Sequence, residues 1–224
     1  MSGCWAKEGS LYSRVEINMS NLNEVMKISD IAKIRTGFTF REKIEEVESG
    51  SAHIVQIKDV RTIWTNTWSH TLYSEDLPKI RWEGKDNASV AANCVLLPCR
   101  GEFLQASYFV GSKNSSSRLP VIVSSQFLVI FPKENVLPEY LCWYLNQPNV
   151  QHRLRYESQG SSMPMLSIGS ISQFLIEVPN LEIQQSIIKL NRLWEQEQVL
   201  AHKLLTNREQ LMQGIFQKLL QGNK

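Results

Sequence analysis

The sequence is poor in cysteine, and its cysteines lack the spacing of a metal site. Only four of the 224 residues are cysteine, and no two of them form a CxxC pair. Cys94 and Cys99 lie in one apolar run, with no histidine near them in the sequence. Because zinc sites and disulfide frameworks need paired, recurring ligands, we expect free buried thiols, as in proteins of a reducing compartment.

Motifs for phosphate binding and catalysis are also missing. The chain has no GxGxxG loop, no GxxxxGK(S/T) loop and no Asn-Pro-Pro-Tyr-like segment of the kind that amino-methyltransferases use. The acidic residues at 45–48 are typical of a solvated surface. The four histidines are scattered and are interpreted as surface or core-edge residues: His53, His70, His152 and His202. These absences favour a binding protein with no catalytic residue, metal or cofactor of its own.

Long apolar runs are absent as well. No run approaches the ~20 residues that span a bilayer, and the N-terminus lacks the apolar segment of a signal peptide. We therefore expect a cytoplasmic protein without a membrane partner. Hydrophobic residues make up 42% of the chain, which indicates a globular protein. The net charge of only +2 means that any nucleic-acid surface must be created by the fold, which has to cluster the basic groups.

The pattern along the chain predicts an α+β protein. Residues 1–24 are polar and are interpreted as an N-terminal extension, and residues 25–179 as one domain. Short helices are expected at 29–34, 137–146 and 147–157, and strand and turn structure at 168–178. Runs rich in Val, Ile and Phe predict the strands of an irregular, mostly antiparallel sheet at 52–57, 89–97, 106–110, 121–124 and 127–131.

Residues 180–222 predict one long helix. Proline is absent from 181 to 224, and Asn180 is a suitable N-cap. At 1.5 Å per residue such a helix is ~60 Å long, more than a domain of this size can cover, so a coiled coil with a partner is expected. Glu197 and Arg208 interrupt its apolar stripe, and a break near Gly214 or at 206–207 is the alternative. The stripe includes Ile187, Leu190, Trp194, Ala201, Leu204, Leu211 and Ile215.

Four segments, in this order, resemble the DNA-specificity (S) subunit of type I restriction–modification systems. Residues 26–41 form a helical turn followed by Gly37 and a polar-aromatic loop, and residues 93–101 form a strand that ends in Arg100-Gly101. Residues 158–166 are a polar loop, and residues 178–187 bring a proline and a Glu-x-x-Gln helix start. No single segment is a strong motif, but their order and spacing cover almost all of 26–222.

The resemblance implies a target recognition domain that binds double-stranded DNA, followed by a helix that sets a spacing. A full-size S subunit resembles two such units, whereas this chain carries one, so it looks like a half-size S subunit. This implies that two copies pair through antiparallel helices and read a bipartite, palindromic target. The alternatives are a truncated gene and completion by a different half-subunit.

The resemblance also implies protein partners. Methyltransferase subunits, which carry S-adenosylmethionine, dock near the helices in this family, and a restriction translocase subunit then joins. Trp194, Leu205 and Phe216 are candidates either for that interface or for packing within the helix pair. Two other hypotheses remain open: an interaction protein that occupies methyltransferase subunits without reading DNA, and a fragment of a modification enzyme with its own activity.

Polar residues in loops are the candidates for DNA contact, because strands must bury one face. Arginine and lysine bind guanine edges or phosphates, glutamine reads adenine, and small hydroxyl residues permit close backbone approach. The candidates are Thr39, Arg41, Lys58, Arg100, Gln105, Lys113, Arg118, Gln159, Ser161 and Ser162.

Overall fold

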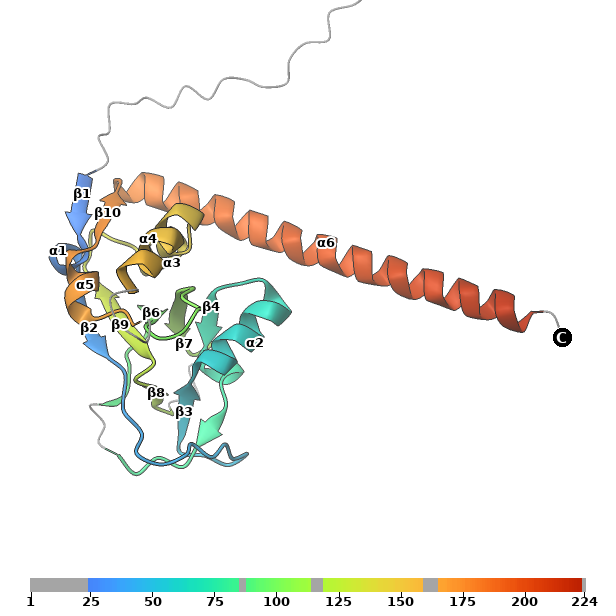
Figure 1. Ribbon diagram of the computed structural model, residues 1–224, viewed down its shortest axis with the longest axis horizontal. Coiled ribbons are helices and arrows are strands. Elements are labelled where there is room, and N and C mark those ends of the chain that lie inside the picture. The colour runs from blue at the N-terminus through green and yellow to red at the C-terminus, as the bar shows by residue number, and fades with distance from the viewer. Residues whose placement is uncertain (1–23, 85–87, 114–118, 159–164, 223–224) are drawn as a thin grey trace, which may run out of the picture.

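A computed structural model describes residues 24–84, 88–113, 119–158 and 165–222 (Figure 1). Except for Glu24, the expected N-terminal extension lies outside these residues. The described part contains a mixed α+β domain and a long C-terminal helix, so the predicted fold class is confirmed. The domain is closed where its two ends meet, because β1 (Glu24–Lys27) pairs antiparallel with β10 (Leu175–Val178).

Within the described residues, the largest sheet has five strands. Their order is β2 (Ala32–Thr36), β9 (Phe127–Pro132), β6 (Cys94–Pro98), β7 (Ser107–Gly111) and β4 (Thr71–Tyr73). All neighbouring pairs are antiparallel except β4 and β7. Strands β6 and β9 are buried on both faces, since Val95 and Leu97 face one core while Cys94 and Leu96 face another. This alternation with period two explains why both sequences are continuous apolar runs.

A smaller sheet forms the lower end of the domain in Figure 1. Strand β3 (Ala52–Val55) lies between β5 (Lys79–Ile80) and β8 (Val121–Val123), and it is parallel to β8. Phe40, Ile44 and Trp82 pack against its core. The sheets are therefore mostly antiparallel, as predicted, with two parallel pairs.

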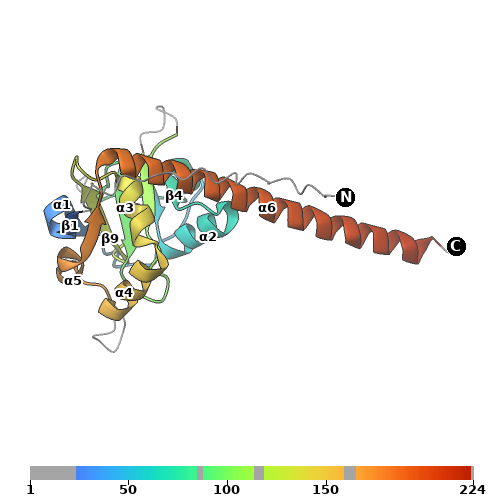
Figure 2. The same cartoon turned by 90° about the horizontal axis from the view of Figure 1, so that it is seen from above.

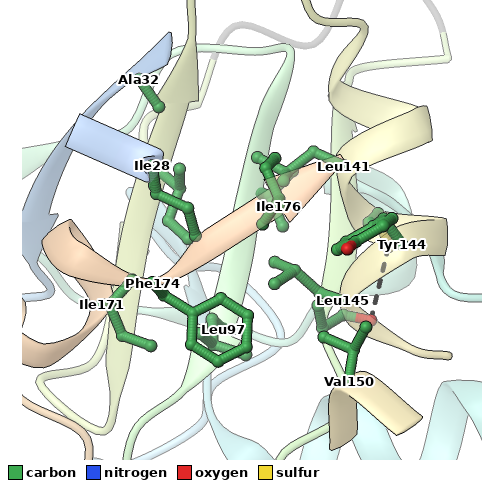
Figure 3. Packing of buried hydrophobic residues seen from close by; sticks show 14 of the residues in the cluster. Ile28, Ala32, Leu97, Leu141, Tyr144, Leu145, Val150, Ile171, Phe174 and Ile176 are labelled. Atoms are coloured by element: carbon green, nitrogen blue, oxygen red, sulfur yellow. Dashed lines mark hydrogen bonds between the residues drawn. The ribbon is translucent and has the colours of Figure 1, made fainter. Parts of the chain in front are cut away.

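Helices cover one face of the large sheet. These are α3 (Pro138–Leu145), α4 (Pro148–Ser158) and α5 (Ile168–Gln173), together with the short α1 (Ile28–Ile31). Figure 3 shows Leu141 and Leu145 of α3 facing Ile176 of β10, with Phe174 over Leu97 of the sheet. This cluster is the main core, and it joins the two chain ends of the domain to the sheet.

The local predictions were wrong at three places. The expected strand at 52–57 ends at Val55 and is followed by helix α2 (Ile57–Thr67) and the 3₁₀ turn η1 (Ser74–Asp76). The expected helical turn at 29–34 gives way to β2 after Ile31. Residues 168–178 divide into α5 and β10. Helix α2 is rich in β-branched and aromatic residues, which favour strands, and a capping box between Gln56 and Asp59 starts it instead.

The C-terminal helix α6 runs without a break from Leu181 to Gln221, 41 residues, so the predicted long helix is confirmed. The Asn180 side chain caps it by accepting the N–H of Ile183 at 2.9 Å. At 1.5 Å per residue it is ~60 Å long. Figures 1 and 2 show its first half along α3 and its second half extending away from the domain. Beyond His202 its residues are exposed, apart from half-buried Thr206 and Gly214.

One buried side chain joins α6 to the domain. The Gln184 amide is fully buried, and its Nε2 donates to the carbonyl oxygens of Asn135 at 3.0 Å and Pro179 at 2.8 Å. Its Oε1 accepts the N–H of Leu137 at 2.9 Å. About two turns further along the same contact with α3, Arg192 forms an ion pair with Glu139. These contacts fix the angle at which the helix leaves the domain.

Replacing Gln184 by leucine is expected to lower the free energy of unfolding by about 2–4 kcal/mol, since three backbone groups lose the hydrogen bonds that the buried amide makes with them. Chemical denaturation measures the change. Gln185→Leu, at the exposed neighbouring position, is the control and should change stability little. Equal stability of the two variants would contradict the anchoring role of Gln184.

Candidate nucleic-acid interface and exposed helix face

The loop that carries Thr39 and Arg41 is held against the turn at 124–126. The Phe38 N–H donates to the Val123 carbonyl at 2.7 Å, and the Ser125 N–H donates to the Phe38 carbonyl at 2.8 Å. At Gly37 a Cβ atom would lie 2.0 Å from the Ser124 carbonyl oxygen, so only glycine permits this approach. Thr39 and Arg41 follow directly, and both are exposed.

Arg100 adjoins the same turn from another element. It follows Cys99, the first residue after β6. The Cys99 N–H donates to the Gln126 carbonyl at 2.8 Å. The chain then turns at Gly101, which has a φ of +81°. Among the described residues, Arg100 and Arg41 form no ion pair. The residues just before Thr39 and just before Arg100, distant in sequence, thus both bond to this turn or to the end of β8.

Two other candidates are already bound to acidic side chains. Lys58 pairs with Glu46, and this contact raises the pKa of Lys58. The Lys113 ammonium lies 2.7 Å from an Asp76 carboxylate oxygen and 4.6 Å from the centre of the Tyr73 ring. A phosphate has to compete with these carboxylates, which lowers the gain from either lysine.

The remaining candidates are placed differently. Gln105 lies under α6 in a groove, and its Oε1 is buried with no hydrogen-bond partner in the described part of the chain. Arg118, Gln159, Ser161 and Ser162 lie outside the described residues.

Sequence reasoning missed Arg61, an exposed residue of α2. Its guanidinium lies 5.1 Å from the centre of the Phe103 ring, which belongs to the loop that follows Arg100. This contact places a further cation beside the candidate loop. The Gln56-x-x-Asp59 spacing of the capping box was the available signal for α2.

Several other cations have structural partners. Arg35 donates to the Ser89 carbonyl, Lys133 to the Asp30 carbonyl and Arg153 to the Leu175 carbonyl. These bonds fasten strand and helix ends, so the basic residues divide into a group that holds the fold and an exposed group at the loops.

A groove of about 770 Å³ separates α6 from α2 and α3. Four tryptophans contribute to its wall: Trp64, Trp68, Trp143 and Trp194. The His70 ring stacks on Trp64 with centroids 6.0 Å apart, and burial lowers the pKa of His70 to about 4. Burial also raises the pKa of Glu195 on the α6 side. Burial therefore keeps the His70 ring neutral near neutral pH and shifts the pKa of Glu195 in the direction of its neutral form.

The apolar stripe expected on α6 is exposed along most of its length. Leu190 is 70% exposed, Trp194 55% and Leu211 63%, and Leu204 and Ile215 are exposed too. Ala201 is small but exposed. Ile187 differs, because it is half-buried and packs against the main core. An apolar surface of this extent indicates a binding face.

None of the described helices combines the length and the apolar character needed to cross a membrane. Likewise, histidine, cysteine and acidic side chains in this part of the chain do not gather into a metal-binding group of three or more.

Residues 21–191 match the type I restriction modification DNA specificity domain. This match covers the recognition domain and the start of α6. The chain belongs to that family. A relative is the type I restriction enzyme HindI specificity subunit of Haemophilus influenzae, which is 30% identical over 98 residues, or 42% of this chain and 21% of that protein.

Solved structures of S subunits share the fold. The HsdS subunit from Thermoanaerobacter tengcongensis superimposes with a TM-score of 0.56 at 16% identity, over 90% of this chain and 45% of that one. The S subunit from M. genitalium gives a TM-score of 0.52 at 14% identity, over 89% of this chain and 46% of that one. The chain spans less than half the length of each of these relatives.

Helix α2 provides a pH test of this part of the fold. The Asp59 carboxylate caps the helix by accepting the Gln56 N–H at 2.9 Å, and burial raises the pKa of Asp59 to about 6. Its protonated form is therefore favoured in the folded state. The stability this provides is present below the unfolded pKa of about 4 and is lost as the pH rises through about 6.

Asp59→Asn keeps an acceptor for the Gln56 N–H but removes the ionisation. Measured by urea denaturation, the wild type should match this variant near pH ~4 and become less stable than it near pH ~7.5. A difference that is constant over this range would show that Asp59 does not titrate as its burial demands.

Proposed function

We propose that this chain is a non-catalytic DNA-recognition subunit of a type I restriction–modification complex. It pairs with a second copy of itself, reads a bipartite palindromic site in double-stranded DNA and docks methyltransferase subunits. Methyl transfer with S-adenosylmethionine, and any cleavage by a translocase subunit, then belong to the partners.

The observation that carries the proposal is the long helix with one recognition domain at one end. The domain covers only the first half of α6, and the second half carries exposed leucines and a phenylalanine: Leu204, Leu205, Leu211, Phe216 and Leu219. Burying each such side chain stabilises an assembly by about 1.5–3 kcal/mol relative to exposure. A partner helix is the element that satisfies a stripe with this period.

Pairing also explains how one small domain recognises DNA selectively. A single domain that contacts a few base pairs binds weakly, whereas two linked domains gain from effective concentration. Two identical domains related by a two-fold axis require inverted half-sites, and the helix pair sets their separation.

The exposed cations support a DNA-binding face at the loops. Arg41 and Arg100 follow Phe38 and Cys99, which both bond to the turn at 124–126. Arg61 lies beside the loop after Arg100. An arginine in this position can bind both acceptors of a guanine edge or a phosphate.

The other flank of α6 supports a docking role. At about 100° per residue, Leu200 projects on the side of the stripe away from the tryptophan groove, and it is exposed. It remains available to a methyltransferase subunit after the helices pair.

The full chain is expected to be a homodimer, and a variant ending at Lys203 a folded monomer. The shortened helix keeps Gln184, Ile188 and the contact between His202 and Trp68, so the domain retains its anchor. Light scattering gives the mass, and circular dichroism checks folding. A full-length monomer at micromolar concentration would overturn the pairing. Methyl transfer to DNA by the purified chain alone would favour a modification enzyme instead.

Arg100→Ala is expected to weaken binding of the cognate DNA by the assembled complex by about 1–3 kcal/mol if the guanidinium binds a base edge. Loss of a phosphate contact would instead weaken binding to all sequences and reduce the salt dependence. Fluorescence anisotropy at two salt concentrations separates these. Lys27→Ala, on β1, is the control. Unchanged affinity for Arg100→Ala would remove this residue from the interface.

A further inference from the structure

Helix α6 carries two separate seams. The inner seam faces the chain's own domain, and its members repeat at steps of four and three: Gln184, Ile188, Asn191, Glu195, Gln198 and His202. Gln184 and Ile188 are buried, and the next three are half-buried. His202 closes the seam, with its ring 5.8 Å from the Trp68 ring.

The outer seam begins beside the inner one and continues nearly to the end of the helix. Its members alternate strictly at steps of three and four: Ile187, Leu190, Trp194, Glu197, Ala201, Leu204, Arg208, Leu211, Ile215 and Lys218. At about 100° per residue it lies roughly 100–140° around the helix from the inner seam. A partner helix on this seam therefore has room beside the domain.

We propose that the outer seam binds the outer seam of a second copy, antiparallel, in one register fixed by Glu197 and Arg208. This rests on the proposed homodimer and specifies its interface. In that register every layer is defined: Ile187 meets the partner's Lys218, Leu190 the partner's Ile215, Trp194 the partner's Leu211, Glu197 the partner's Arg208, and Ala201 the partner's Leu204. The two-fold axis passes between residues 202 and 203.

Charge complementarity selects this arrangement. Glu197 and Arg208 interrupt the apolar stripe, and a charge in a helix interface is costly unless it is paired. The antiparallel register pairs each with the other, twice by symmetry. A parallel pair would set Glu197 against Glu197 and Arg208 against Arg208. A shift by one heptad would place both charges against apolar or uncharged layers. Polar residues at such positions commonly specify register and orientation.

The same register covers the tryptophan groove. The groove opens along the flank of the outer seam, where Ile187 and Trp194 form part of its wall. In an antiparallel pair equivalent flanks of the two helices lie on the same side, so the partner's Met212 and Phe216 face the groove. Both side chains are exposed in one copy, 46% and 55%. The off-stripe phenylalanine thus gains an apolar site.

Charge exchange tests the register. Glu197→Arg or Arg208→Glu alone sets like charges together in two layers and should raise the dimer dissociation constant at least about tenfold. The double variant restores both pairs and should return it to within about threefold of wild type. Lys203→Glu, on the opposite side of the helix, is the matched control. Sedimentation equilibrium measures the constants.

Distance measurements test the orientation independently. Spin labels are introduced at Lys203→Cys or Gln217→Cys in a Cys4→Ser background, since Cys94, Cys99 and Cys142 are buried. At 1.5 Å per residue, labels at 217 should be about 45 Å apart along the axis. Labels at 203 should lie at almost the same level along the axis, so that only the width of the helix pair separates them. A one-heptad shift changes the longer distance by about 10 Å.

The outcomes separate the two proposals. A dimer with restored affinity in the double variant and a long distance at 217 supports the register. A dimer with equal distances at 203 and 217, or one in which the double variant stays as weak as the single variants, overturns the register but keeps the homodimer. A monomeric full-length chain overturns both.

Discussion

The buried amide of Gln184 is the contact on which the rest of the molecule depends. A helix can measure a distance between two recognition domains only if its angle to each domain is constant. Gln184 connects α6 to the segment before α3 and to its own entry at Pro179 through three hydrogen bonds. The free-energy penalty of a buried amide without hydrogen-bond partners is larger than the net stabilisation from the bonds themselves. Any orientation of the helix that breaks these bonds is therefore unfavourable. The exposed Arg192–Glu139 pair adds less, because solvent screens it.

Much of the fold could be predicted from the sequence, because local patterns match the local structure. The apolar runs at β6 and β9, Pro138 at the start of α3 and the Asn180 cap all predict the elements that are present. The sequence prediction missed helix α2, because its β-branched residues favour strands and it ends at Trp68 in a left-handed conformation without a glycine. The Gln56-x-x-Asp59 spacing was the one local signal for its start. The parallel pairs are set by long-range packing, on which local pattern carries no information.

In the candidate site, too, local features could be predicted from the sequence and long-range contacts could not. Loop chemistry identified Arg41 and Arg100 as candidates, whereas the bonds of the preceding Phe38 and Cys99 to the turn at 124–126 depend on pairing between distant strands. Sequence alone did not separate these exposed residues from Lys58 and Lys113, which have acidic partners. The sequence identifies the basic residues, but only the fold shows which of them already form an ion pair with a carboxylate.

In the proposed dimer, the charged positions in the outer seam have a physical reason of their own. An entirely apolar stripe would bind a partner helix more tightly, yet in several registers and both orientations. Glu197 and Arg208 make association less favourable than apolar residues would, since each charge must be desolvated in the interface. In return only one antiparallel register pairs both. For the proposed dimer the affinity of the pair would matter less than its register, because each heptad of slip would move the two domains by about 10 Å, roughly three base pairs. A helix that measures DNA has to exclude such slippage, and two opposite charges separated along one apolar seam are a simple way to do so.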